Sequence, residues 1–176
     1  MKLAARRGFL QIAVRQREPV GRRLKSAYNK ASKEAWRRTG EYFHEHLRDE
    51  RFTPEHAAKA GYSRRKGEGL PRGSRAFARS YYGRKLRSDA GGGRGKANPL
   101  VFSGDTRRNV ATQYRVSSTS KGARVTYRGA RVLNFKHPKS RIRMTDEFRR
   151  LLPDEVTTLA RVYDDALDHL LSSQSN

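Results

Sequence analysis

Residues 110–127, VATQYRVSSTSKGARVTY, decide the fold that the sequence predicts. Apolar, aromatic or β-branched residues occupy every second position on both sides of a polar stretch, residues 117–122. A period of two is typical of strands that bury one face, and a short polar stretch between two such runs predicts a tight turn. The stretch therefore predicts a β-hairpin. Its inward positions are Val110, Thr112, Tyr114 and Val116 before the turn, and Ala123, Val125 and Tyr127 after it.

Three shorter apolar runs predict further strands around the hairpin. Leu10, Ile12 and Val14 alternate with other residues, and residues 132–135 extend the sheet after the hairpin. Residues 99–102, PLVF, predict an ordered segment after the Gly-rich stretch and before the hairpin. The following Ser-Gly-Asp predicts a turn in which Asp105 or Thr106 caps one helical turn.

Two long segments have the 3.6-residue period of amphipathic helices. One runs from about Gly21 to Arg48, and the other from Pro153 to residue 172, with acids in its first turn. Thr53-Pro54-Glu55 predicts the start of a short helix that Gly61 ends. The order of elements predicts an α+β fold: a small antiparallel sheet packed by a long N-terminal helix and a C-terminal helix.

We expect one domain over residues 1–176 that contains two basic loops. Residues 61–97 hold nine Gly and eleven Lys or Arg against Glu68 and Asp89, and such a composition is costly to order. The predicted division is residues 10–60 (strand and helices), 61–97 (a long, flexible, basic Gly-rich loop), 98–135 (strand and hairpin), 136–152 (a second basic loop) and 153–172 (C-terminal helix).

The formal net charge of +23 predicts a negatively charged partner, because such an excess of cations repels itself. Nucleic acid supplies closely spaced phosphates, and an acidic protein surface supplies carboxylates that pair with Arg. Composition does not choose between them. The chain has no Cys, which excludes disulfides and thiolate chemistry, and no apolar run approaches a membrane span. We expect a soluble protein.

The sequence shows no arrangement typical of an enzyme, a cofactor site or a metal site. His44 and His46 lie about 200° apart on a helix, so they do not face one ion. Residues 91–96, GGGRGK, lack the Ser or Thr that follows the lysine of a phosphate-binding loop. Asp164 and Asp165 are adjacent on a helix and point in different directions. We expect a non-enzymatic protein without a cofactor.

Cationic and aromatic residues are interleaved in the first basic loop, which predicts partner contact there. Arg and Lys bind phosphates or carboxylates, while Tyr and Phe either stack on bases or bury against protein. The candidate partner or nucleic-acid contacts are Arg64, Arg65, Lys66, Arg75, Arg79, Tyr81, Tyr82, Arg84, Lys85, Arg87, Arg107, Arg108, Lys139 and Arg141.

The same region resembles the tail-completion, or head–tail joining (neck), proteins of tailed phages. That family shows a basic aromatic stretch followed by a segment like Pro-Leu-Val-x-Ser/Thr-Gly-x-Leu/Thr-Arg. Here the match comprises Tyr62, Arg65, Tyr81 or Tyr82, Lys85, and then NPLVFSGDTR at residues 98–107, with Thr106 where many relatives have Leu. The motif covers about residues 62–110, and the layout, including the Leu152-Pro153-Asp154-Glu155 helix start, covers about residues 10–171.

The resemblance implies a structural virion protein, made in the host cytoplasm, that forms a homo-oligomeric ring, expected to be a hexamer. The ring would join connector or neck proteins to the tail, surround the DNA channel and touch DNA without sequence preference. Assembly positions implied by the motif are Pro99, Leu100, Val101, Phe102 and Gly104. A stand-alone RNA- or DNA-binding protein is the alternative.

Overall fold

A computed structural model describes residues 10–11, 22–87, 98–101, 104–128, 131–134 and 142–173. The chain divides into two compact units, each assembled from segments that are distant in the sequence. The first unit contains residues up to Arg48, the hairpin Tyr114–Tyr127 and the segment from Leu151 onward. The second contains Asp49–Gln113 and Arg128–Arg150. Each unit is described by itself.

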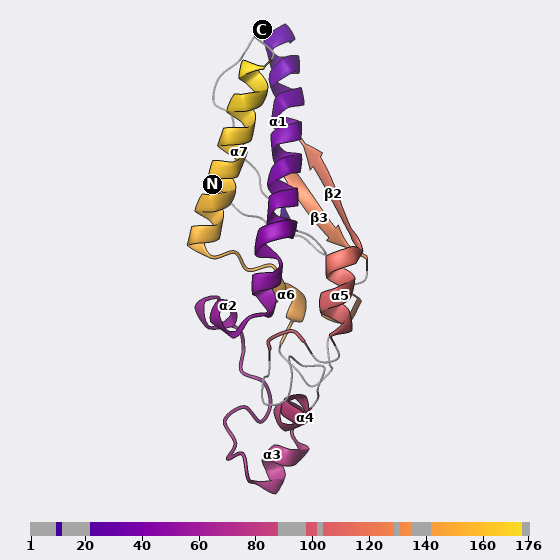
Figure 1. Ribbon diagram of the computed structural model, residues 1–176, viewed down its shortest axis with the longest axis vertical. Coiled ribbons are helices and arrows are strands. Elements are labelled where there is room, and N and C mark those ends of the chain that lie inside the picture. The colour runs from indigo at the N-terminus through magenta and orange to yellow at the C-terminus, as the bar shows by residue number, and fades with distance from the viewer. Residues whose placement is uncertain are drawn as a thin grey trace. The chain divides into compact units, whose positions relative to one another are not determined.

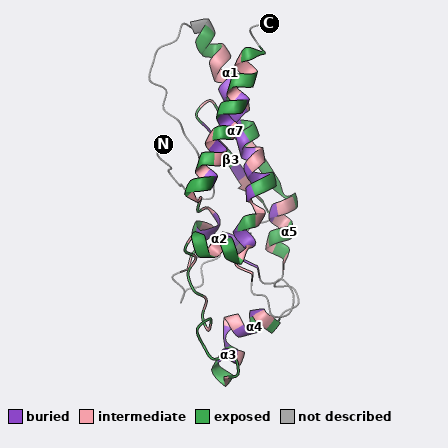
Figure 2. Cartoon of the chain, turned by 60° about the vertical axis from the view of Figure 1, so that its left-hand side comes forward, coloured by how far each residue is buried: buried purple, intermediate pink, exposed green. Residues whose placement is uncertain are grey.

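Two long helices build most of the first unit. Helix α1, Arg22–Tyr42, continues into a π-helical segment, Phe43–Leu47, and α7 spans Pro153–Ser172. The two helices lie side by side, and α1 also contacts both strands of the hairpin (Figure 1). Figure 2 shows buried residues on the sides of α1 and α7 that face each other, and exposed residues on their outer sides. The apolar face of each amphipathic helix is therefore the face that packs against the other helix.

The sheet of the first unit has three antiparallel strands in the order β1-β3-β2. These are β1 (Leu10–Gln11), β2 (Tyr114–Thr119) and β3 (Gly122–Tyr127), with Val116 opposite Val125. A Cβ atom at Gly40 of α1 would lie 2.8 Å from Cγ1 of Val116. The missing side chain thus allows the helix to pack closely against the sheet.

The core of the first unit is apolar and aromatic. Trp36 and Tyr163 are 2% and 6% exposed, with ring centroids 4.3 Å apart. The Tyr163 hydroxyl shares a 2.8 Å hydrogen bond with Ser32, whose hydroxyl also donates to the Ser120 carbonyl. Each fully buried large apolar side chain contributes about 1.5–3 kcal/mol. The remaining core members are Ala35, Phe43, Leu47, Ala123, Val125, Leu159 and Ala166.

Short helices and turns build the second unit. They are the 3₁₀ segment Asp49–Phe52, α2 (Pro54–Lys59), α3 (Arg75–Arg79), α4 (Tyr81–Arg87), α5 (Asp105–Thr112), the 3₁₀ segment Arg131–Asn134 and α6 (Met144–Phe148). Thr53 caps α2 by accepting a 3.2 Å hydrogen bond from the His56 amide, as its position predicts. Phe52 packs against Phe148 with ring centroids 5.8 Å apart.

The α+β prediction is confirmed, with its antiparallel sheet and its two long helices. The hairpin, the Pro54 helix and the C-terminal helix are also where the sequence places them. Strand Leu10–Gln11 is shorter in the described residues than the predicted run, whose residues 12–14 lie outside them. Within the described ranges, every helix is too short or too polar to span a lipid bilayer.

The prediction of a wholly flexible loop over residues 61–97 is wrong for its described part. Helices α3 and α4 lie inside it. Likewise, the second basic loop, residues 136–152, contains α6. Side-chain caps and buried contacts made within the unit offset the ordering cost that glycine and charge impose on these segments.

Three strand predictions are also wrong. Residues 99–100 form a turn in which Leu100 has a φ of 58°. Val110 and Thr112 belong to α5, which Gly104 begins in the left-handed conformation, so the first hairpin strand starts at Tyr114. Residues 131–134 are 3₁₀-helical and bury Leu133. In each case a short run of apolar residues fits a turn or a single helical turn as well as a strand.

Candidate binding site

Residues 62–87, here called the basic module, form a compact helix pair in the second unit. Ser74 caps α3 by accepting a 3.0 Å hydrogen bond from the Phe77 amide. The Ser80 hydroxyl donates to the Phe77 carbonyl at 2.7 Å and accepts from the Gly83 amide at 3.0 Å. Serine caps at both helix starts explain why so charged a stretch is helical.

Two glycines permit the close contacts inside the basic module. A Cβ at Gly83 would lie 2.0 Å from the Phe77 carbonyl oxygen. A Cβ at Gly67, which has a φ of +94°, would lie 2.1 Å from Oγ of Ser80. Both positions therefore exclude any other residue without movement of the backbone.

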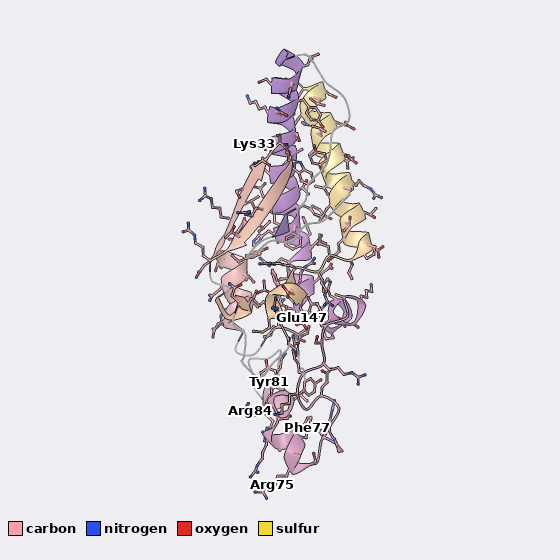
Figure 3. The ribbon with its side chains drawn as sticks, turned by 180° about the vertical axis from the view of Figure 1, so that it is seen from behind. Lys33, Arg75, Phe77, Tyr81, Arg84 and Glu147 are labelled. Atoms are coloured by element: carbon pink, nitrogen blue, oxygen red, sulfur yellow. The ribbon has the colours of Figure 1, made fainter. Side chains whose placement is uncertain are left out.

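Aromatic side chains of the basic module are turned into its interior. Phe77 is 8% exposed and lies edge-on to Tyr82, with ring centroids 6.4 Å apart. Tyr81 and Tyr82 are half-buried, and burial raises the pKa of the Tyr81 hydroxyl. Figure 3 shows Phe77 and Tyr81 together with the arginines of the same helices. These aromatic rings mainly form a small core within the basic module.

Most cations of the basic module remain exposed. Arg75 and Arg79 lie on α3, and Arg84 and Arg87 on α4 (Figure 3 labels Arg75 and Arg84). The Arg87 guanidinium also donates to the Ala78 carbonyl. These residues, together with Arg64 and Lys66, form an exposed cationic surface on one module, as a site for phosphates or carboxylates requires.

Arg65, by contrast, has its counter-charge within the unit. Its guanidinium forms two hydrogen bonds to the Glu147 carboxylate, at 3.0 and 2.5 Å. The side chains of Arg65 and Glu147 are only 13% and 4% exposed. The Ser63 amide donates to the same carboxylate at 2.8 Å. Glu147 of α6 thus anchors the start of the basic module.

Lys85 is also buried, at 1% exposed, although it belongs to the predicted contact residues. Its ammonium donates to the backbone carbonyl of Asn98. Burial, and secondarily the positive charge of Arg65, lower the pKa of Lys85 to about 8, while Glu68 opposes this shift. Lys85 therefore lies behind the exposed cationic surface.

A cavity of about 850 Å³ adjoins the basic module within the second unit. Its lining includes Tyr62, Arg64, Arg65, Tyr82 and Lys85 from the module. The rest of the lining comes from the module's Ser63 and Glu68, from α2 and the following turn, Pro54, Glu55, Ala57, Ala58 and Gly61, and from Asn98 and Pro99. Cavities of this volume accommodate ligands of the size of a peptide segment or a cofactor.

The remaining predicted contact and assembly residues lie elsewhere in the second unit. Arg107 and Arg108 are exposed on α5, where Arg107 pairs with Asp49 at 3.5 Å and Arg108 with Asp105. Leu100 and Val101 are buried, Pro99 is half-buried, and Gly104 has the positive φ that begins α5. Phe102, Lys139 and Arg141 lie outside the described residues.

Sequence reasoning missed Glu147 and Asn98. Glu147 is separated from Arg65 by 82 residues, and Asn98 contributes only a backbone carbonyl. One signal points to Glu147: Asp146-Glu147 is an acidic pair in an otherwise basic stretch, residues 136–152. Acids that stand among cations are candidates for a buried ion pair.

The first unit has its own pattern of surface charge. Exposed lysines, among them Lys25, Lys30 and Lys33, lie on α1. The exposed acids of α7 are Asp154, Asp164, Asp165 and Asp168. Two neighbouring helices of one unit thus present charges of opposite sign.

Comparison with known proteins found no family model, curated protein or solved structure that matches the chain.

Proposed function

We propose that this chain is a structural, non-enzymatic subunit of the head–tail joint of a tailed bacteriophage. In this proposal copies of the chain form a ring, with six subunits expected, that connects the tail to the connector or portal and surrounds the DNA channel. The proposal combines the family resemblance at residues 62–110 with the observation that carries it: charges of opposite sign on α1 and α7 of one unit.

Opposite charges on two faces of one subunit favour head-to-tail association between copies. The α1 face of one copy, with Lys30 and Lys33, complements the α7 face of the next, with Asp164 and Asp165. Contacts between different faces repeat around a closed ring when the rotation per copy closes. Lys33, labelled on α1 in Figure 3, is exposed.

An edge strand gives a second means of association. Among the described residues, β2 pairs only with β3, so one side of Tyr114–Thr119 has backbone groups that another chain can pair with. Addition of a strand to such an edge is a common mode of recognition between subunits.

The basic module supplies contacts to polyanions. Its exposed arginines suit phosphates of DNA in the channel or carboxylates of a neighbouring ring. Phe77 is buried and Tyr81 and Tyr82 are half-buried, and this favours contacts with backbone phosphates or carboxylates over stacking on unpaired bases. The observation supports a channel or joint protein over a reader of single strands.

Ring formation is tested by mass photometry of the purified chain and by cryo-EM of the assembled particles. The variant Lys33→Asp should shift particles from ring to monomer, and adding Asp165→Lys should restore rings, because the charges at the interface are then exchanged. Lys59→Asp makes the same charge change on exposed α2 and serves as the control. Only monomers, alone and with phage neck proteins, would contradict the proposal.

The alternative, a stand-alone nucleic-acid binder, is separated from it by a salt titration. For non-specific channel contacts, affinity for duplex DNA should fall steeply with salt and should not depend on sequence. Tight, sequence-dependent binding at physiological salt would favour the alternative.

A further inference from the structure

We infer that the cavity of the second unit binds a carboxylate side chain from an acidic peptide segment of a neighbouring protein, with Lys85 as its counter-charge. The inference rests on the proposed joining function in one respect, the choice of a protein as the source of the carboxylate.

The first argument is the state of Lys85. Its side chain is 1% exposed, and its ammonium donates to one acceptor, the Asn98 carbonyl, which is uncharged. Among the described residues it makes no ion pair; Glu68 is the acid that acts on it, at longer range, and Arg65 repels it. A buried ammonium without a carboxylate in direct contact is costly, and an incoming anion that pairs with it lowers that cost.

The second argument is space. Lys85 and Asn98 both line the cavity of about 850 Å³, so a ligand in the cavity would lie against these two residues. Ligand sites commonly have volumes of about 300–1,000 Å³ with a few polar groups that orient the ligand. The cavity therefore has room for an extended segment of a few residues.

The third argument selects a carboxylate over a phosphate chain. Glu55 and Glu68 line the same cavity and would repel a run of phosphates, which carries several negative charges, more strongly than a single carboxylate. One carboxylate matches the single charge of Lys85. Pro54, Ala57 and Pro99 contribute apolar lining against which the methylene groups of a Glu or Asp side chain can pack.

The inference predicts a pH dependence that ordinary surface attraction lacks. Burial and Arg65 lower the pKa of Lys85 to about 8, so the ammonium loses its charge within an accessible range. Binding of a carboxylate should weaken as the pH rises through about 8. The other charged groups lining the cavity are Glu55, Arg64, Arg65 and Glu68, and the tyrosines lining it are Tyr62 and Tyr82.

Fluorescence anisotropy of the full chain tests the inference, with a fluorescein-labelled alanine peptide that contains one Glu as the probe. Ala58→Phe places a ring in the cavity from exposed α2 and should weaken binding about tenfold or more. Ala76→Phe makes the same change on exposed α3, outside the cavity lining, and should change affinity less than about twofold. Lys85→Met should weaken binding similarly and abolish its decline above about pH 8.

Equal effects of Ala58→Phe and Ala76→Phe would overturn the inference, as would a wild-type affinity that does not change with pH. Displacement of the peptide by a single-stranded oligothymidylate as effectively as by unlabelled peptide would also overturn it, in favour of phosphate. Mass photometry of the same samples distinguishes the two proposals. Rings without cavity binding would contradict this inference alone. Cavity binding without rings would contradict the joining function alone.

Discussion

The two units of this protein are stabilised in different ways. The first buries a continuous apolar core, in which Trp36, Leu159 and Tyr163 are 6% exposed or less. The second buries more charged residues: Arg51 is 0%, Lys85 1% and Glu147 3% exposed, whereas the first buries Glu155, at 5%. Apolar burial is non-directional and tolerant, whereas a buried ion is stable only with particular partners. We therefore expect the stability of the first unit to tolerate single polar changes. The stability of the second should depend on single polar changes, on pH and on anions.

The largest effect is expected from Trp36→Ala, which tests the apolar core of the first unit. Loss of a buried indole that packs 4.3 Å from the Tyr163 ring should lower the free energy of unfolding by about 4 kcal/mol. Chemical denaturation followed by circular dichroism measures it. Leu24→Ala, at a side chain that is 67% exposed, is the control and should cost less than about 0.5 kcal/mol. A cost below about 1 kcal/mol for Trp36→Ala would break the comparison.

A slightly smaller loss is expected from Glu147→Ala in the second unit. The change leaves Arg65 buried without a counter-charge and should cost about 3 kcal/mol. Hydrogen exchange at the Ser63 amide, which donates to Glu147, reports the local loss. The double variant Arg65→Met/Glu147→Leu should recover most of the stability, because no buried charge remains. A double variant as unstable as Glu147→Ala would show that packing dominates this site.

The pH dependence of stability should have opposite signs in the two units. The pKa of Lys85 is lowered to about 8, below that of the unfolded chain, so the unfolded state binds more protons and the second unit gains stability as the pH rises from about 8 toward 10. The pKa of Tyr163 is raised to about 12, chiefly by burial, so the first unit loses stability as the pH rises above about 10.

Hydrogen exchange resolved by mass spectrometry separates these two responses. Lys85→Met should abolish the gain in the second unit, and Tyr163→Phe should reduce the loss in the first. A second unit that gains no stability between about pH 8 and 10, or a first unit that loses none above about pH 10, would refute the prediction.

The smallest effect is expected from Arg37→Ala on exposed α1. Arg37 pairs with Glu34 at 2.6 Å and with Glu41, but its side chain is 44% exposed, so solvent screens both pairs. The variant should cost about 0.5 kcal/mol or less, and added salt should remove the difference from wild type. A cost near that of Glu147→Ala would mean that surface charge stabilises the first unit as strongly as buried charge stabilises the second.

Elements with a local signal could be predicted from the sequence. The period-two pattern from Tyr114 to Tyr127 gives the hairpin, and the Pro153 start with its apolar stripe gives α7. The signal failed where it was short: Val110 and Thr112 alternate as a strand would, yet Gly104 starts a helix there. Glycine and charge in residues 61–97 predict flexibility, but helix caps at Ser74 and Ser80 stabilise α3 and α4 there.

The sequence by itself determined the charge of the protein, its α+β class and the pattern of faces on α1 and α7, because composition and periodicity are properties of neighbouring residues. Only the tertiary structure decided which cations are exposed. Arg84 and Lys85 are adjacent in one basic run, but one is exposed and the other lies beside the Asn98 carbonyl. Burial and charge pairing depend on segments as distant as Arg65 and Glu147, and no local pattern records such contacts.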